Sequence, residues 1–67
     1  MKTYSLALES CAGGITCGWR FDATDDDAAI RFARQRAQAQ FSRIFGLSEI
    51  LPGHIPEWGY YRTRVLI

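Results

Sequence analysis

Apolar and polar residues alternate along two stretches near the start of the chain, a pattern typical of β-strands that bury one face. Residues 2–9 place an apolar set on one face, made up of Tyr4, Leu6 and Leu8. Residues 15–23 carry a longer set, made up of Ile15, Cys17, Trp19, Phe21 and Ala23. Between the two stretches, Gly13 and Gly14 tolerate the positive φ of a tight loop. The pattern therefore predicts a β-hairpin whose apolar face lies in the core.

The next segment has the pattern of an amphipathic helix that runs to Phe45. Thr24 can cap its first turn, and Asp27 can reach back to the Thr24 backbone as in a capping box. Apolar residues then recur at helical spacing and form one stripe, made up of Ile30, Ala33, Ala37, Phe41 and Ile44. Gly46 follows as a helix stop. We expect the stripe to pack on the hairpin.

The last part of the chain is predicted to be a loop followed by a strand. Residues 47–57 contain Pro52, Gly53 and Pro56, which are typical of a loop. Residues 58–67 alternate again, and the set predicted to face inward is Tyr61, Thr63, Val65 and Ile67.

These elements predict a single α+β domain over residues 1–67 with the element order β-β-α-β. A hairpin followed by a helical crossover most often returns the next strand beside the first. The predicted sheet is antiparallel, has three strands in the order two, one, three, and carries one helix on one face. The two edge strands contain no proline in their interiors, so self-association, for example as a homodimer, is also expected.

The chain has 67 residues and a net charge of +1, but its charges are unevenly distributed. The first 27 residues carry two basic and five acidic side chains, and the remaining 40 carry six arginines and two glutamates. Arginine forms planar, bidentate contacts with carboxylates and phosphates. No apolar run is long enough to span a bilayer, and the first ten residues do not resemble a signal peptide. We therefore expect a cytoplasmic protein with no membrane partner.

The set of reactive side chains argues against an enzyme, and no cofactor or metal site is predicted. The only histidine, His54, lies in the predicted loop, and the inward position of Cys17 indicates a buried, unreactive thiol. The triplet Asp25 to Asp27 lacks the ligand spacing of a calcium loop. Helix capping and the helix dipole explain these three carboxylates.

A disulfide between Cys11 and Cys17 is an open alternative. If five residues form the hairpin loop, Ala7 faces Cys17 and Glu9 faces Ile15, so Cys11 does not lie opposite Cys17. Free thiols are also the usual state of cysteines in a reducing compartment. We therefore favour free thiols.

One candidate binding surface is the side of the predicted helix opposite its buried stripe. The residues expected to contact a partner there are Phe32, Gln35, Arg36 and Arg43. Phe32 has two interpretations: its ring stacks on Arg36 as an isolated exposed aromatic, or it anchors in a pocket of a partner.

The second candidate surface is the open face of the sheet. The arginine and aromatic residues predicted to lie on it are Arg20, Tyr60, Arg62 and Arg64. Aromatic and arginine side chains on an open sheet stack bases and hold phosphates in RNA-recognition modules. A solvated sheet face also carries such residues without any ligand, so nucleic-acid binding is the second hypothesis.

The layout as a whole resembles a known group of proteins. Lys2-Thr3-Tyr4, the hairpin, the run Phe21 to Asp25 before an alanine-rich helix, and a final aromatic strand resemble the very small proteins of phages and mobile elements, some of which are anti-CRISPR proteins. The resemblance implies a stoichiometric blocker of a larger nucleoprotein machine. The leading prediction is thus a non-catalytic binding protein that occludes a surface of a larger partner. A nucleic-acid-binding module and a self-associating structural protein are the alternatives.

Overall fold

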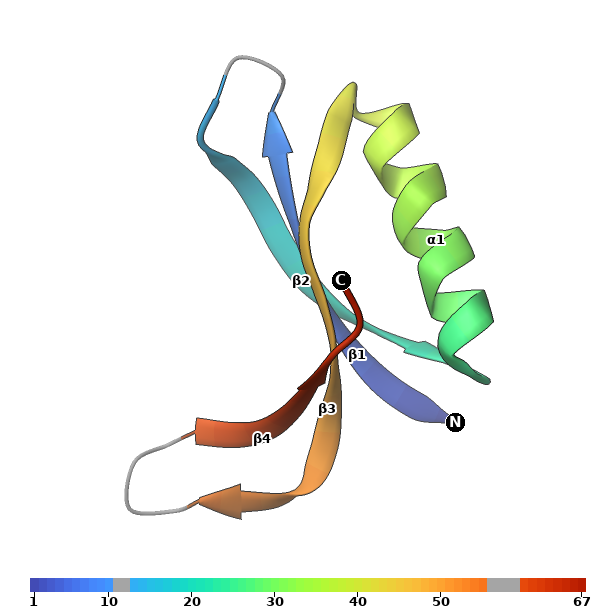
Figure 1. The fold of residues 1–67 in the computed structure, drawn as a ribbon, viewed down its shortest axis with the longest axis vertical. Coiled ribbons are helices and arrows are strands. Elements are labelled where there is room, and N and C mark those ends of the chain that lie inside the picture. The colour runs from blue at the N-terminus through green and yellow to red at the C-terminus, as the bar shows by residue number, and fades with distance from the viewer. Residues whose placement is uncertain (11–12, 56–59) are drawn as a thin grey trace.

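The computed structural model describes residues 1–10, 13–55 and 60–67, and the side chains of residues 15–17, 53–55, 60 and 61 lie outside the description. An antiparallel sheet with strand order β2-β1-β3-β4 carries one helix on one face (Figure 1). The elements are β1 (Lys2–Ser10), β2 (Ile15–Ala23), α1 (Asp26–Ala39), β3 (Ser42–Ile55) and β4 (Tyr60–Val65). The α+β class is confirmed, but the sheet has four strands and not the predicted three.

The predicted hairpin of β1 and β2 is present. Tyr4, Leu6 and Leu8 are fully buried, and Glu9 pairs with Ile15 as expected. A register shift between Leu8 and Glu9 places Cys17 opposite Leu8, so the predicted pairing of Cys17 with Ala7 is wrong by one residue. Cys11 lies outside the described residues, so the preference for free thiols over a Cys11–Cys17 disulfide stays a prediction.

Helix α1 begins one residue later than predicted and ends earlier. Its N-cap is Asp25 and not Thr24, because the Asp25 carboxylate accepts a hydrogen bond of 2.8 Å from the backbone N–H of Ala28. At the other end the backbone N–H of Gln40 donates to the Arg36 carbonyl at 3.1 Å, and Phe41 adopts a left-handed backbone with φ 52°. This conformation ends the helix where glycine more often stands.

Because α1 ends at Ala39, the predicted buried stripe is only partly correct. The residues of α1 that are buried against the sheet are Ala29, Ala33 and Ala37. Phe41 is 85% exposed, and Ile44 lies on β3. The small alanine side chains let the helix lie close to the sheet, mainly over β3.

The expected loop over residues 47–57 is largely strand, because β3 extends from Ser42 to Ile55. The strand accommodates Pro52 and Gly53 at a register shift between Leu51 and His54, where they have no partner residue on β4. The segment beside β1 is therefore β3, and β4 pairs with β3 as the outer strand. The two sheet edges, β2 and β4, are nevertheless the segments predicted to be edges.

The inward face predicted for the last strand is reversed in the part that is described. Val65 is 71% exposed and Ile67 is 51% exposed, whereas Leu66 packs against the core. Backbone N–H groups of Leu66 and Ile67 both donate to the Leu47 carbonyl. Arg64 lies on the helix side, where two carboxylates neutralise it. Tyr61 lies outside the described side chains.

Candidate functional surfaces

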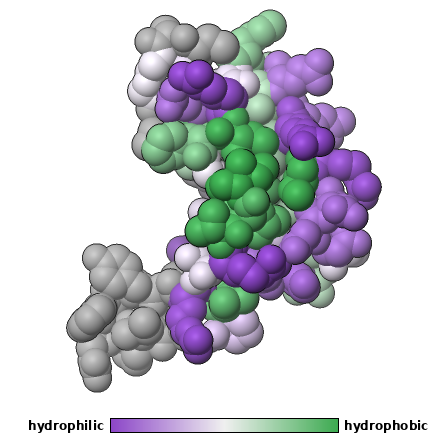
Figure 2. Space-filling view, viewed as in Figure 1, coloured by the Kyte–Doolittle hydropathy of each residue, from purple (hydrophilic) through white to green (hydrophobic). Residues whose placement is uncertain are grey.

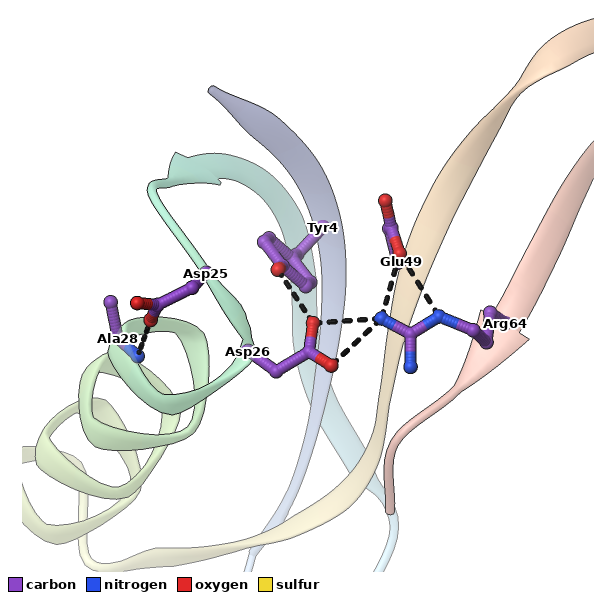
Figure 3. A network of polar contacts seen from close by, with 6 residues as sticks. All are labelled: Tyr4, Asp25, Asp26, Ala28, Glu49 and Arg64. Atoms are coloured by element: carbon purple, nitrogen blue, oxygen red, sulfur yellow. Dashed lines mark hydrogen bonds and ion pairs between the residues drawn. The ribbon is translucent and has the colours of Figure 1, made fainter.

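A polar cluster joins the start of α1 to three strands of the sheet (Figure 3). Arg64 on β4 bonds both carboxylate oxygens of Asp26 at 2.7 and 2.8 Å, and its Nε and Nη2 reach Glu49 on β3 at 3.0 and 2.8 Å. The hydroxyl of Tyr4 on β1 donates to Asp26 at 2.8 Å. The Arg64 guanidinium thus links the start of α1 to β3 and β4, and the Asp26 carboxylate links the start of α1 to β1.

The protonation states of this cluster indicate a structural role. Hydrogen bonds from Arg64 and Tyr4 hold the pKa of Asp26 below its usual value. Burial, with the hydrogen bond to Asp26, raises the pKa of Tyr4 to about 12. Hydrogen bonds to Asp26 and Glu49 raise the pKa of Arg64 further. Near neutral pH the carboxylate stays charged and the phenol stays protonated, so neither group is poised to transfer a proton.

An aromatic cluster lies between α1 and the β1–β2 hairpin. Phe21 stacks on Phe32 with ring centroids 4.2 Å apart, and on Tyr4 at 5.6 Å. The guanidinium of Arg36 lies 5.7 Å from the ring centre of Trp19 and 5.5 Å from that of Phe32. Phe32 therefore packs toward the sheet, and its predicted outward position is wrong. We use the name aromatic cluster for these residues: Tyr4, Trp19, Phe21, Phe32 and Arg36.

The solvent side of α1 carries a different set, which we call the arginine face: Arg31, Arg34, Gln35 and Gln38. These residues are exposed, line one shallow depression, and follow the three- and four-residue spacing of one helix side. Among the described residues, neither Arg31 nor Arg34 makes a hydrogen bond, ion pair or ring contact. Figure 2 shows hydrophilic side chains along the α1 side of the molecule and hydrophobic ones in the middle of the view.

The structure separates the four residues of the predicted helix surface. Gln35 belongs to the arginine face, whereas Phe32 and Arg36 belong to the aromatic cluster. Arg43 lies on β3 and not on the helix, and its guanidinium forms an ion pair with Glu9 of β1. Arg31 and Arg34 were not predicted, because the predicted binding side of the helix was centred on Phe32, although their spacing with Gln35 and Gln38 was visible in the sequence.

The predicted nucleic-acid surface on the sheet is also divided. Arg20 pairs with Ser5, so it lies on the face away from α1. Arg64 lies on the helix side, and Arg62, two residues before it on β4, shares that side. Three of the four residues therefore do not form one surface, and the Tyr60 side chain lies outside the described set.

The described part of the chain contains no group of three or more His, Cys, Asp or Glu residues placed to hold a metal ion. The side chains of Cys17 and His54 are outside the description. None of the described helices is long and apolar enough to cross a membrane. Comparisons with protein-family models, curated proteins and solved structures found no match.

Proposed function

We propose that this chain is a non-catalytic binding protein that occludes an acidic surface of a larger partner protein through its arginine face. The observation that carries the proposal is the state of Arg31 and Arg34, whose guanidinium groups are exposed and unpaired among the described residues. Arginine is enriched among the residues that dominate protein interfaces, and its planar fork matches a carboxylate.

Other arginines of the chain are already engaged, which supports this assignment. Arg64 bonds Asp26 and Glu49, and Arg43 bonds Glu9. Arg36 lies against aromatic rings. Internal carboxylates or rings thus neutralise or cover these cations. The arginine face offers two charges for a ligand from outside.

The helix also presents this face in a fixed geometry. Asp25 caps the first turn, and the network around Asp26 ties that turn to β1, β3 and β4. Buried alanines hold the opposite side of α1 on the sheet. A rigid helix loses little conformational freedom when it binds, so its contacts contribute more fully to affinity.

A protein partner fits the charge distribution better than a nucleic acid. The net charge is only +1, and Asp22, Asp25 and Asp27 are exposed near the start of α1. Nucleic-acid binding depends on neutralising several phosphates, which such carboxylates oppose. An acidic protein surface needs only a few charge pairs in the correct register.

The proposal is tested by direct binding between purified components. The partner is first isolated by affinity purification from cells that express the chain and is then purified itself. The dissociation constant is measured for the wild type and for the double variant Arg31→Glu/Arg34→Glu. We expect the double variant to bind about 30-fold more weakly or worse, because two charge pairs become repulsive.

The matched control is Arg62→Glu, which makes the same charge change at another exposed arginine, on β4. It should leave the dissociation constant within about twofold, a change of less than 0.5 kcal/mol. Equal weakening by both changes would reject the arginine face. Binding to mixed oligonucleotides that weakens steeply with salt and is lost in the double variant would replace the protein partner with a nucleic acid.

The resemblance to small phage and mobile-element proteins leads to a narrower hypothesis, in which the partner is part of a nucleoprotein machine. A blocker of a nucleoprotein machine would have to cover a protein surface that normally engages another component. In this hypothesis, the acidic surface of the partner is the surface that normally engages the other component. An inhibition assay on the isolated partner tests this narrower form of the proposal.

A further inference from the structure

We infer that a second copy of this chain pairs with the outer edge of β2, in antiparallel orientation and with Phe21 at the two-fold axis. The strand is at the edge of the sheet, is nine residues long and contains no proline. One side of β2 pairs with β1 along the strand, and no other described strand lies along its second side. An edge of this kind offers unpaired backbone N–H and C=O groups to another strand.

The charges on β2 select one register of that pairing. Arg20 and Asp22 are both exposed, and both lie on the face of the sheet away from α1. When Phe21 faces its own counterpart, Arg20 of each copy lies opposite Asp22 of the other. A shift that centres the pairing on Arg20 or Asp22 sets like charges opposite each other instead, which is unfavourable. The charges of β2 are therefore complementary to those of a second copy when the pairing is centred on Phe21.

The aromatic cluster supplies the apolar part of the same contact. Trp19 and Phe21 lie on the helix side of β2 and are only half-buried, although Phe32 and Arg36 pack against them. In the proposed register, Phe21 meets its counterpart and Trp19 lies beside Ala23 of the second copy. Cross-strand aromatic neighbours stabilise an antiparallel pair, and burial of half-exposed rings adds to this.

The position of α1 leaves room for the second copy. The helix packs mainly over β3, which is separated from β2 by β1 (Figure 1). An antiparallel pair related by a two-fold axis keeps both helices on the same face of one continuous sheet, with twice the four strands of the single chain. The inference does not rest on the arginine face, although the dimer would present two copies of that face on one side.

A charge-swap experiment tests the register, with sedimentation equilibrium as the measurement. R20D sets carboxylates opposite one another, and D22R sets guanidinium groups opposite one another. Each single variant should weaken dimerisation about tenfold or more, since two attractive pairs become repulsive. The double variant R20D/D22R restores opposite charges with their order exchanged. Its dissociation constant should return to within about threefold of the wild type.

Two controls separate this effect from other causes. R62D makes the same charge change on the opposite edge strand, β4, and should leave dimerisation unchanged. T3V removes the 2.9 Å hydrogen bond from the Thr3 hydroxyl to Asp22 without changing any charge, and should also have little effect. Circular dichroism checks that each variant is folded. If one single variant unfolds, the other single variant and the double variant still decide the register.

Three results would overturn the inference. The first is a wild-type chain that stays monomeric throughout the concentration range. The second is a dimer that neither folded single variant weakens, which would place the contact elsewhere. The third is a folded double variant that stays as weak as the single variants, which would reject the pairing of Arg20 with Asp22 of the second copy.

Discussion

The β1–β2 hairpin and the β3–β4 hairpin belong to one sheet but obtain their burial by different means. In the first, alternation of apolar residues matches the buried face, and Leu6 and Leu8 are fully enclosed. In the second, the helix-facing side of β4 carries Arg64, while the apolar Val65 faces away and is 71% exposed. Hydropathy therefore indicates the orientation of a strand only where no network of ion pairs and hydrogen bonds competes with it.

The largest expected effect is at Leu6, in the hairpin whose burial is apolar. Leu6→Ala leaves a cavity between the sheet and α1, and should lower the free energy of unfolding by about 2 to 5 kcal/mol. Its counterpart Val65→Ala, in the other hairpin, should change that free energy by less than about 0.5 kcal/mol, because the side chain is exposed. Urea titration followed by circular dichroism measures both. Similar losses at the two positions would contradict the contrast between the hairpins.

A smaller effect is expected at Phe32, where α1 contacts the first hairpin. Phe32→Ala removes the ring that stacks on Phe21, and should cost about 1 to 3 kcal/mol because the side chain is only partly buried. The matched control is Phe41→Ala, whose ring is 85% exposed and which should cost less than about 0.5 kcal/mol. The predicted helix buries Phe41 in its stripe and exposes Phe32, which implies the opposite ranking. A greater loss at Phe41 in the same urea titration would therefore favour the longer helix of that prediction.

The sequence predicted the first half of the fold more accurately than the second, for local reasons. Strand alternation agrees with the tertiary structure over residues 2–10 and 18–23, and Gly13 and Gly14 have the positive φ expected of them. After Ala39, the apolar spacing suits either a helix or a strand, and the left-handed Phe41 gives no glycine signal for the helix end. Pro52 and Gly53 are typical of loops, but they lie at a register shift inside the long strand β3, so the sequence pattern did not indicate this strand.

The candidate surfaces were harder to predict, because they depend on which arginines find partners inside the molecule. Arg43 and Arg64 bond carboxylates 34 and 38 residues away in the sequence. The antiparallel register of β1 with β3 brings Arg43 to Glu9, and the packing of the start of α1 against the sheet brings Asp26 to Arg64. The spacing of Arg31 and Arg34 was visible in the sequence, but the sequence did not show that they lack an internal partner among the described residues.

The smallest effect should come from the Asp26 side of the polar cluster, because Arg64 and Asp26 are 45% and 39% exposed and solvent screens part of their attraction. Asp26→Asn should lower the melting temperature less than Leu6→Ala does, because Arg64 keeps its contact with the buried Glu49. The pKa of Asp26 is lowered in the folded chain. Its contribution to the free energy of unfolding is therefore present above the ordinary carboxyl pKa of about 4 and is lost as pH falls.

At alkaline pH the same cluster acts through Tyr4, whose pKa is raised to about 12 in the folded chain. The unfolded phenol loses its proton near pH 10, so the stabilising contribution is complete below that pH and decreases as pH rises toward 12. Tyr4→Phe removes this titration, and should flatten the alkaline limb of a plot of melting temperature against pH. It leaves Arg64 paired with Asp26 and Glu49, so the acid limb should persist. A Tyr4→Phe chain with an unchanged alkaline limb would show that the folded chain does not hold the Tyr4 phenol protonated above its ordinary pKa.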